Sequence, residues 1–165
     1  MRIRRLIRGT LDWDRLETVA RELQDRYGRP VIRVTVLDAD NWLSTPLVVD
    51  GEWFVKVISP QNAAVHALFT SARNLGAFTA GGEGFFERSA GPVEMAEHEL
   101  DATRRMAALG LNVPEPVEAF EVDGLGVVVM EYLDDFTTLD ALPAETVEAY
   151  ADDVFAALST MHDND

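Results

Sequence analysis

Two Asp-Gly pairs constrain the fold of this chain most. Asp50-Gly51 and Asp123-Gly124 each lie between two apolar, β-branched segments, and this arrangement is the strongest short-range signal for a β-hairpin. Together with one further β-branched segment, the two hairpins predict a five-stranded antiparallel sheet. The expected strands are residues 31–37, 45–49, 52–58, 117–122 and 125–132.

Apolar residues at helical spacing predict four helices around this sheet. They are expected at residues 14–27, at 63–75, from 93 up to Gly110, and from Pro143 onward. Gly28 and Gly110 are typical helix stops, and Pro143 is typical of a helix start. The third helix should bury a stripe formed by Val93, Ala96, Leu100, Thr103 and Ala107. The last should bury a face formed by Val147, Ala151, Val154, Leu158 and Met161.

These elements predict an α+β chain with three parts. Residues 1–30 form an N-terminal helical extension, and residues 31–133 form the unit that contains the sheet and one main helix. Within that unit, residues 59–92 are expected to be an insertion with a mobile tip, because Gly81, Gly82 and Gly84 disfavour regular structure. Residues 134–165 form a polar linker and the last helix.

Charge and composition narrow the function. Asp and Glu total 29 against 14 Lys and Arg, a net charge of −15, which disfavours nucleic acid as a direct partner. Either a salt-rich cytoplasm or an acidic binding surface would explain this charge, because salt screens repulsion between carboxylates. The chain has no cysteine, so disulfides and thiolate metal sites are excluded and a cytoplasmic location is expected. No apolar run is long enough to span a membrane.

The lysine content is unusual. Thirteen of the 14 basic residues are arginine, and Lys56 is the only lysine. It lies on the expected apolar strand 52–58. A lone lysine could be kept by chance, but its compact ammonium also suits a point contact with phosphate.

The order of elements and the residues around Lys56 resemble the small lobe of a protein kinase. Phe54-Val55-Lys56-Val57 stands where such kinases carry the lysine that holds the α- and β-phosphates of ATP. That lysine needs a glutamate partner on the next helix. Residues 96–116 resemble the corresponding segment of RIO-type kinases, and in that register Glu99 is the partner. Helical geometry alone does not decide between Glu99 and Glu97, which flank the apolar stripe at about 70° and 90°.

Residues 127–133 resemble a kinase hinge. The resemblance implies that Met130 is the gatekeeper beside the adenine. It implies that the segment Glu131-Tyr132-Leu133 follows the purine edge, with the backbone of Glu131 and Leu133 forming the hydrogen bonds. Phe54 shares the strand face of Lys56. Aminoglycoside phosphotransferases often carry an aromatic residue there that stacks on adenine, whereas the RIO pattern favours a small residue, so the subfamily stays open.

Two features depart from the protein-kinase pattern. The loop at 38–44 contains no glycine, as in RIO-type kinases, which also lack the glycine-rich phosphate loop. The catalytic loop and the metal-binding residues are not recognisable: the end of the chain at 162–165 resembles the helix end that precedes that loop. The resemblance therefore implies that ATP is used with Mg²⁺ held by a missing large lobe, and that the last helix is the first helix of this lobe. The histidines, His66, His98 and His162, lack metal-ligand spacing.

The resemblance implies the ATP-binding lobe of a kinase or small-molecule phosphotransferase. Such an enzyme moves the γ-phosphate of ATP to a hydroxyl of a protein serine or threonine, or of a small molecule. The fragment alone is expected to be inactive. The alternative is a pseudokinase or a protein-binding module that uses the acidic surface and the insertion at 59–92.

Overall fold

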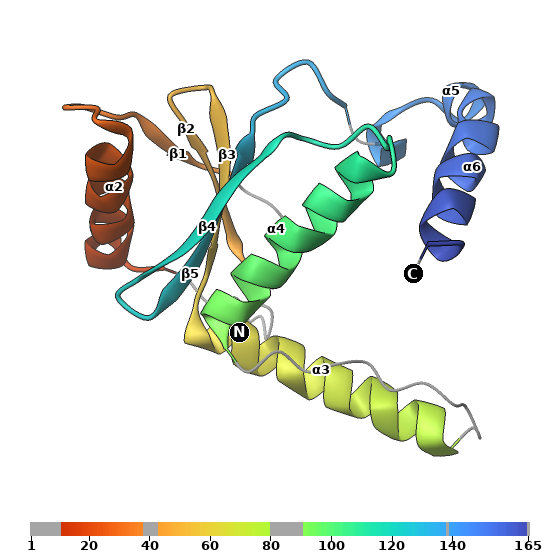
Figure 1. The fold of residues 1–165 in the computed structure, drawn as a ribbon, viewed down its shortest axis with the longest axis horizontal. Coiled ribbons are helices and arrows are strands. Elements are labelled where there is room, and N and C mark those ends of the chain that lie inside the picture. The colour runs from red at the N-terminus through yellow and green to blue at the C-terminus, as the bar shows by residue number, and fades with distance from the viewer. Residues whose placement is uncertain (1–10, 38–42, 80–90, 138, 165) are drawn as a thin grey trace.

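The computed structural model describes residues 11–37, 43–79, 91–137 and 139–164, and its centre is a five-stranded antiparallel sheet (Figure 1). The strand order is β1-β2-β3-β5-β4. The α+β fold expected from the sequence, a kinase-like small lobe, is confirmed. The strands are β1 (Val34–Val36), β2 (Thr45–Val49), β3 (Trp53–Ile58), β4 (Pro116–Val122) and β5 (Leu125–Glu131).

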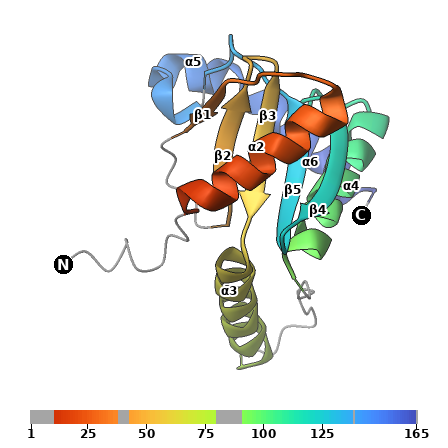
Figure 2. The same ribbon diagram turned by 90° about the vertical axis from the view of Figure 1, so that its left-hand side faces the viewer.

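Each face of the sheet is covered by one helix. Helix α2 (Trp13–Tyr27) lies across one face and α4 (Pro92–Ala108) across the other (Figures 1 and 2). Val19 and Leu23 of α2 are buried against the first face, and Ala96 and Leu100 of α4 against the second. The expected N-terminal helix therefore packs directly on the sheet and contributes to its core.

The two Asp-Gly pairs form the expected hairpin turns. Asp50 and Gly51 have φ angles of 55° and 74°, and Asp123 and Gly124 have φ angles of 50° and 71°. Positive φ at both central residues is the type I′ geometry, whose twist matches that of the flanking strands. The first strand is shorter than the expected 31–37. The amide of Arg33 binds the carboxylate of Asp50 at 2.6 Å, so it does not form a ladder bond.

Helix α3 (Pro60–Thr79) starts earlier and ends later than the expected 63–75, and it projects away from the sheet (Figure 1). Its start is fixed by a reciprocal cap. The amide of Ser59 donates to the side chain of Asn62 at 2.9 Å, and the amide of Asn62 donates to the Ser59 hydroxyl at 3.2 Å. This is a capping box with proline at the first helical position. The glycines at 81–84 lie outside the described residues.

The C-terminal part differs from the expected single helix. It comprises a short 3-10 turn (Leu139–Ala141), α5 (Ala144–Ala149) and α6 (Ala151–His162). Tyr150 lies between α5 and α6. The expected buried face is wrong for the described structure: Val154, Leu158 and Met161 are 39%, 53% and 40% exposed. Leu158 and Met161 line a cavity together with Met106 and Leu109 at the end of α4, so this face is not closely packed in the described structure. The stripe on α4 is also shorter than expected, because Ala107 is exposed.

Candidate functional site

Strand β3 directs Lys56 toward α4. Phe54, Lys56 and Ile58 alternate with Val55 and Val57 along the strand, and successive side chains point to opposite faces. Val55 and Val57 are fully buried in the core beneath α2, whereas Phe54 and Ile58 belong to the cluster beneath α4. The only lysine is thus on the face that α4 covers.

The charged groups of Lys56 and Glu99 form an ion pair. Their side chains are 25% and 32% exposed, so the pair lies at the border between core and solvent. Glu97, the alternative partner, is exposed. The backbone carbonyl of Glu99 also accepts a bond from the buried Thr103 hydroxyl at 2.9 Å. The pairing expected between strand and helix is present, and the docking of α4 selects Glu99 over Glu97.

An apolar surface adjoins the ammonium group. The Nζ atom of Lys56 lies 5.8 Å from the centroid of the Phe54 ring, within the range of a cation–π attraction. Phe54 is directly opposite Met130 in the ladder between β3 and β5, and Met130 is buried. Phe54 is only partly buried. A flat apolar group could therefore contact its ring close to a positive charge.

The start of the hinge segment is held from both sides. The amide of Glu131 donates to the carbonyl of Glu115 at 2.9 Å, and the amide of Tyr132 donates to the carbonyl of Glu52, also at 2.9 Å. The carboxylate of Glu131 accepts the amide of Glu115 at 3.2 Å. The amide of Glu131 is thus already used, so this residue would have to meet a purine with its carbonyl oxygen. Leu133 follows in irregular backbone.

Gly126 is a feature of this site that sequence reasoning missed. A Cβ atom at Gly126 would lie 2.0 Å from the carbonyl oxygen of Pro92 at the start of α4. The helix and β5 therefore approach each other more closely than any side chain would allow. A glycine within an expected strand is the sequence signal for such an approach. This contact seats α4, and thereby Glu99, on the sheet.

A metal site and a membrane-spanning helix are both absent from the described part of the chain. No group of three or more acidic, histidine or cysteine side chains there could hold a metal ion. His98 and His162 are exposed. None of the helices described is long and apolar enough to cross a bilayer. The loop at 38–42, which follows β1, lies outside the described residues.

Comparison with known proteins identifies one family. The family model APH, the phosphotransferase enzyme family, matches residues 37–165. The match includes the strands β2 to β5, the ion pair and the hinge segment, and it leaves out α2. A search of the curated proteins found no match.

Proposed function

Because the chain belongs to the phosphotransferase enzyme family, we propose that it holds ATP at Lys56 and at the hinge segment 130–133. The γ-phosphate of this ATP is the group that the enzyme transfers to a hydroxyl of an acceptor. The observation that carries the proposal is the ion pair between Lys56 and Glu99, on the sheet face that also presents Phe54.

Each side chain has a distinct part in this proposal. Lys56 supplies a compact positive charge for the α- and β-phosphates, and Glu99 keeps that charge in place when nucleotide is absent. Phe54 offers its partly exposed ring to the adenine, with the buried Met130 beside it. The carbonyl of Glu131 and the backbone of Leu133 would meet the purine edge. Tyr132 would contribute through its backbone amide, which donates to the carbonyl of Glu52 just before β3 and so holds the hinge in place.

No group of three or more acidic or histidine side chains in the described part of the chain could hold Mg²⁺ without the phosphates. Carboxylate oxygens from one or two residues normally hold Mg²⁺ together with the phosphates. We therefore assign no step through the metal to these residues. The proposal for this chain is nucleotide binding, with metal ligands and the groups that activate the acceptor supplied by a large lobe.

The acceptor is proposed only as a hydroxyl-bearing molecule, either a protein serine or threonine or a small molecule. Residues 96–116 resemble RIO-type kinases, whereas the aromatic Phe54 resembles aminoglycoside phosphotransferases. The net charge of −15 supports a salt-rich cytoplasm as the working environment, since molar salt screens carboxylate repulsion. This setting is part of the proposal.

Lys56 also offers a direct test of nucleotide binding. Reductive methylation with ¹³C-formaldehyde keeps the lysine charge and gives one side-chain signal, because the chain has a single lysine. Titration with ATP should move this signal and saturate. The affinity should fall by about tenfold or more in Glu99→Gln, in which the ammonium loses its charged partner.

The matched control is Glu97→Gln, which changes the same charge on an exposed position of the same helix. This variant should bind ATP like the wild type. A Lys56 signal that stays unchanged at millimolar ATP would contradict the proposal. It would favour the alternative, a pseudokinase or partner-binding module that uses the acidic surface.

A further inference from the structure

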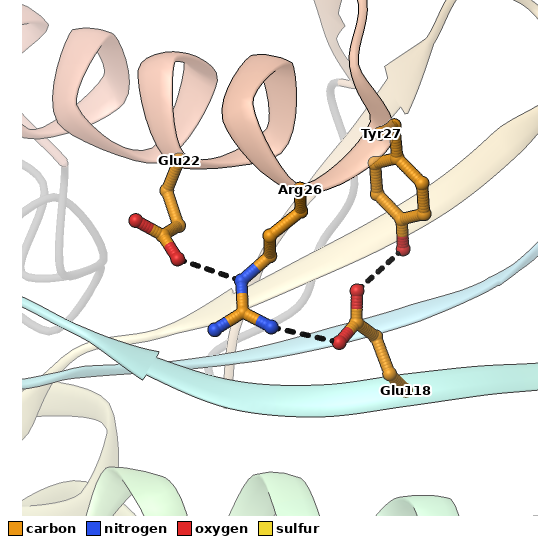
Figure 3. Close-up of polar contacts among 4 residues, drawn as sticks. All are labelled: Glu22, Arg26, Tyr27 and Glu118. Carbon is orange, nitrogen blue, oxygen red and sulfur yellow. Dashed lines mark hydrogen bonds and ion pairs between the residues drawn. The ribbon is translucent and has the colours of Figure 1, made fainter.

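The C-terminal end of α2 binds two parts of the sheet at once. Arg26 and Tyr27 both donate to the carboxylate of Glu118 on β4, at 2.9 and 2.8 Å (Figure 3). Just beyond the helix, Arg29 donates to Asp50 at 3.0 Å and to Glu52 at 2.5 Å. Asp50 and Glu52 belong to the turn between β2 and β3. One end of one helix therefore connects β4 with the start of β3.

Aromatic contacts reinforce the connection at β3. The Tyr27 ring stacks on Trp53, with centroids 4.2 Å apart and ring planes inclined by 28°. The guanidinium of Arg29 lies 4.4 Å from the centroid of the same Trp53 ring. Trp53 is opposite Glu131 in the ladder. Tyr27 and Arg29 thus both contact the ring of Trp53, which is the residue opposite Glu131 of the hinge segment.

The hinge lies between the two parts that α2 connects. The amide of Glu131 in this segment is held by the carbonyl of Glu115 just before β4. The amide of the next residue, Tyr132, is held by the carbonyl of Glu52 just before β3. Glu52 is the residue whose side chain Arg29 binds. A displacement of the β2–β3 turn would therefore move the acceptor of the Tyr132 amide.

We propose that Arg29 is a positioning residue for the hinge. By bridging Asp50 and Glu52 and covering Trp53, it fixes the carbonyl that binds the amide of Tyr132. Arg29 lies outside the residues that the family model matches, so the match does not account for it. Any effect of Arg29 on nucleotide affinity rests on the proposed function, whereas its effect on the amide of Tyr132 does not.

The proposal is tested by amide hydrogen exchange in the whole chain with the substitution Arg29→Ala. Exchange is monitored at each amide by NMR. Exchange at Tyr132 should become about fivefold faster, because the solvent-exposed ion-pair network around Glu52 is lost. The amide of Val128 in the centre of β5 should change much less, which separates a local effect from general destabilisation. The matched control is Arg21→Ala, because Arg21 forms an exposed ion pair with Glu17 on α2, at 2.6 Å.

A second variant decides the matter if Arg29→Ala fails to fold. Arg29→Lys keeps the charge but cannot form the fork that reaches two carboxylates, so it should raise Tyr132 exchange by a smaller factor. Exchange at Tyr132 that rises no more than at Val128 would overturn the proposal. Faster exchange at Tyr132, in a chain whose wild type binds no ATP, would leave the role of Arg29 standing and refute the proposed function instead.

Discussion

The contact between Gly126 and α4 makes the substitution Gly126→Ala a sharp test of how the site is assembled. The added Cβ would lie 2.0 Å from the carbonyl oxygen of Pro92 and 2.5 Å from its carbonyl carbon. Both obstacles are backbone atoms of the first turn of α4, which no rotamer change can remove. Ordinary van der Waals contact begins at 3.4 Å, so this turn must retreat by the difference, about 1.4 Å.

The displacement of α4 would also move Glu99, the partner of Lys56 in the ion pair. If α4 moves as a rigid body, Glu99 moves by the same 1.4 Å. If α4 pivots about its last residue, Ala108, Glu99 lies 9 of the 16 residue steps from the pivot to Pro92, and it moves by about 0.8 Å. Either motion stretches a direct contact between Lys56 and Glu99. Overpacking of this kind should also lower the free energy of unfolding by about 1–3 kcal/mol.

The assay is again the ¹³C-methyl signal of Lys56, measured together with urea denaturation. In Gly126→Ala the signal should move toward its position in Glu99→Gln, which removes the charged partner completely. Gly91→Ala is the matched control. It adds the same atom just before α4, where the backbone is extended and nothing lies within 4 Å. A folded Gly126→Ala variant whose Lys56 signal coincides with the wild type would refute the reasoning.

Three further predictions concern stability. If the net charge of −15 is adapted to salt, the melting temperature should climb steeply from dilute buffer to about 1 M KCl; a flat profile would favour an acidic binding surface. Burial, followed by the hydrogen bond to Glu118, raises the pKa of the Tyr27 phenol above its ordinary 10.0. The unfolded chain therefore loses this proton first as pH rises, so urea stability should decline above about pH 10, and less steeply in Tyr27→Phe. Ser59→Ala should cost about 1 kcal/mol in urea denaturation through loss of the α3 cap, whereas an unchanged value would exclude a role for that cap.

The two hairpins and the end of α2 were predictable because their causes are local. A type I′ turn needs positive φ at both central residues, which Asp-Gly supplies, and both turns have these angles. Gly28 ends α2 with a left-handed φ of 61°, again as the sequence indicated. The cap of α3 is equally local: the Ser-Pro-x-Asn spacing at residues 59–62 indicates a helix that begins at Pro60.

The unpredictable features depend on contacts that sequence spacing does not encode. Glu97 and Glu99 flank the same apolar stripe, so the family resemblance predicted Glu99 where helical spacing alone could not, and the docking of α4 on the sheet brings Glu99 to Lys56. The last helix is interrupted at Tyr150, and Leu158 after it is exposed. Both features depend on the tertiary contacts of this helix, which its sequence does not specify. The contacts of Arg29 join a residue after α2 to a turn some 20 residues later, and no motif marks them.

The register of β3 connects the stability of this fold with its chemistry. Val55 and Val57 fill the core beneath α2, while Lys56 between them reaches Glu99 on the opposite face. A slip of one residue would exchange the two faces and place the only lysine against Val19 and Leu23. Burial of an unpaired ammonium is strongly unfavourable, so such a register would be rejected. The Asp50-Gly51 turn fixes the correct register from the neighbouring strand. The turn that shapes the hairpin therefore also determines that the lysine faces α4.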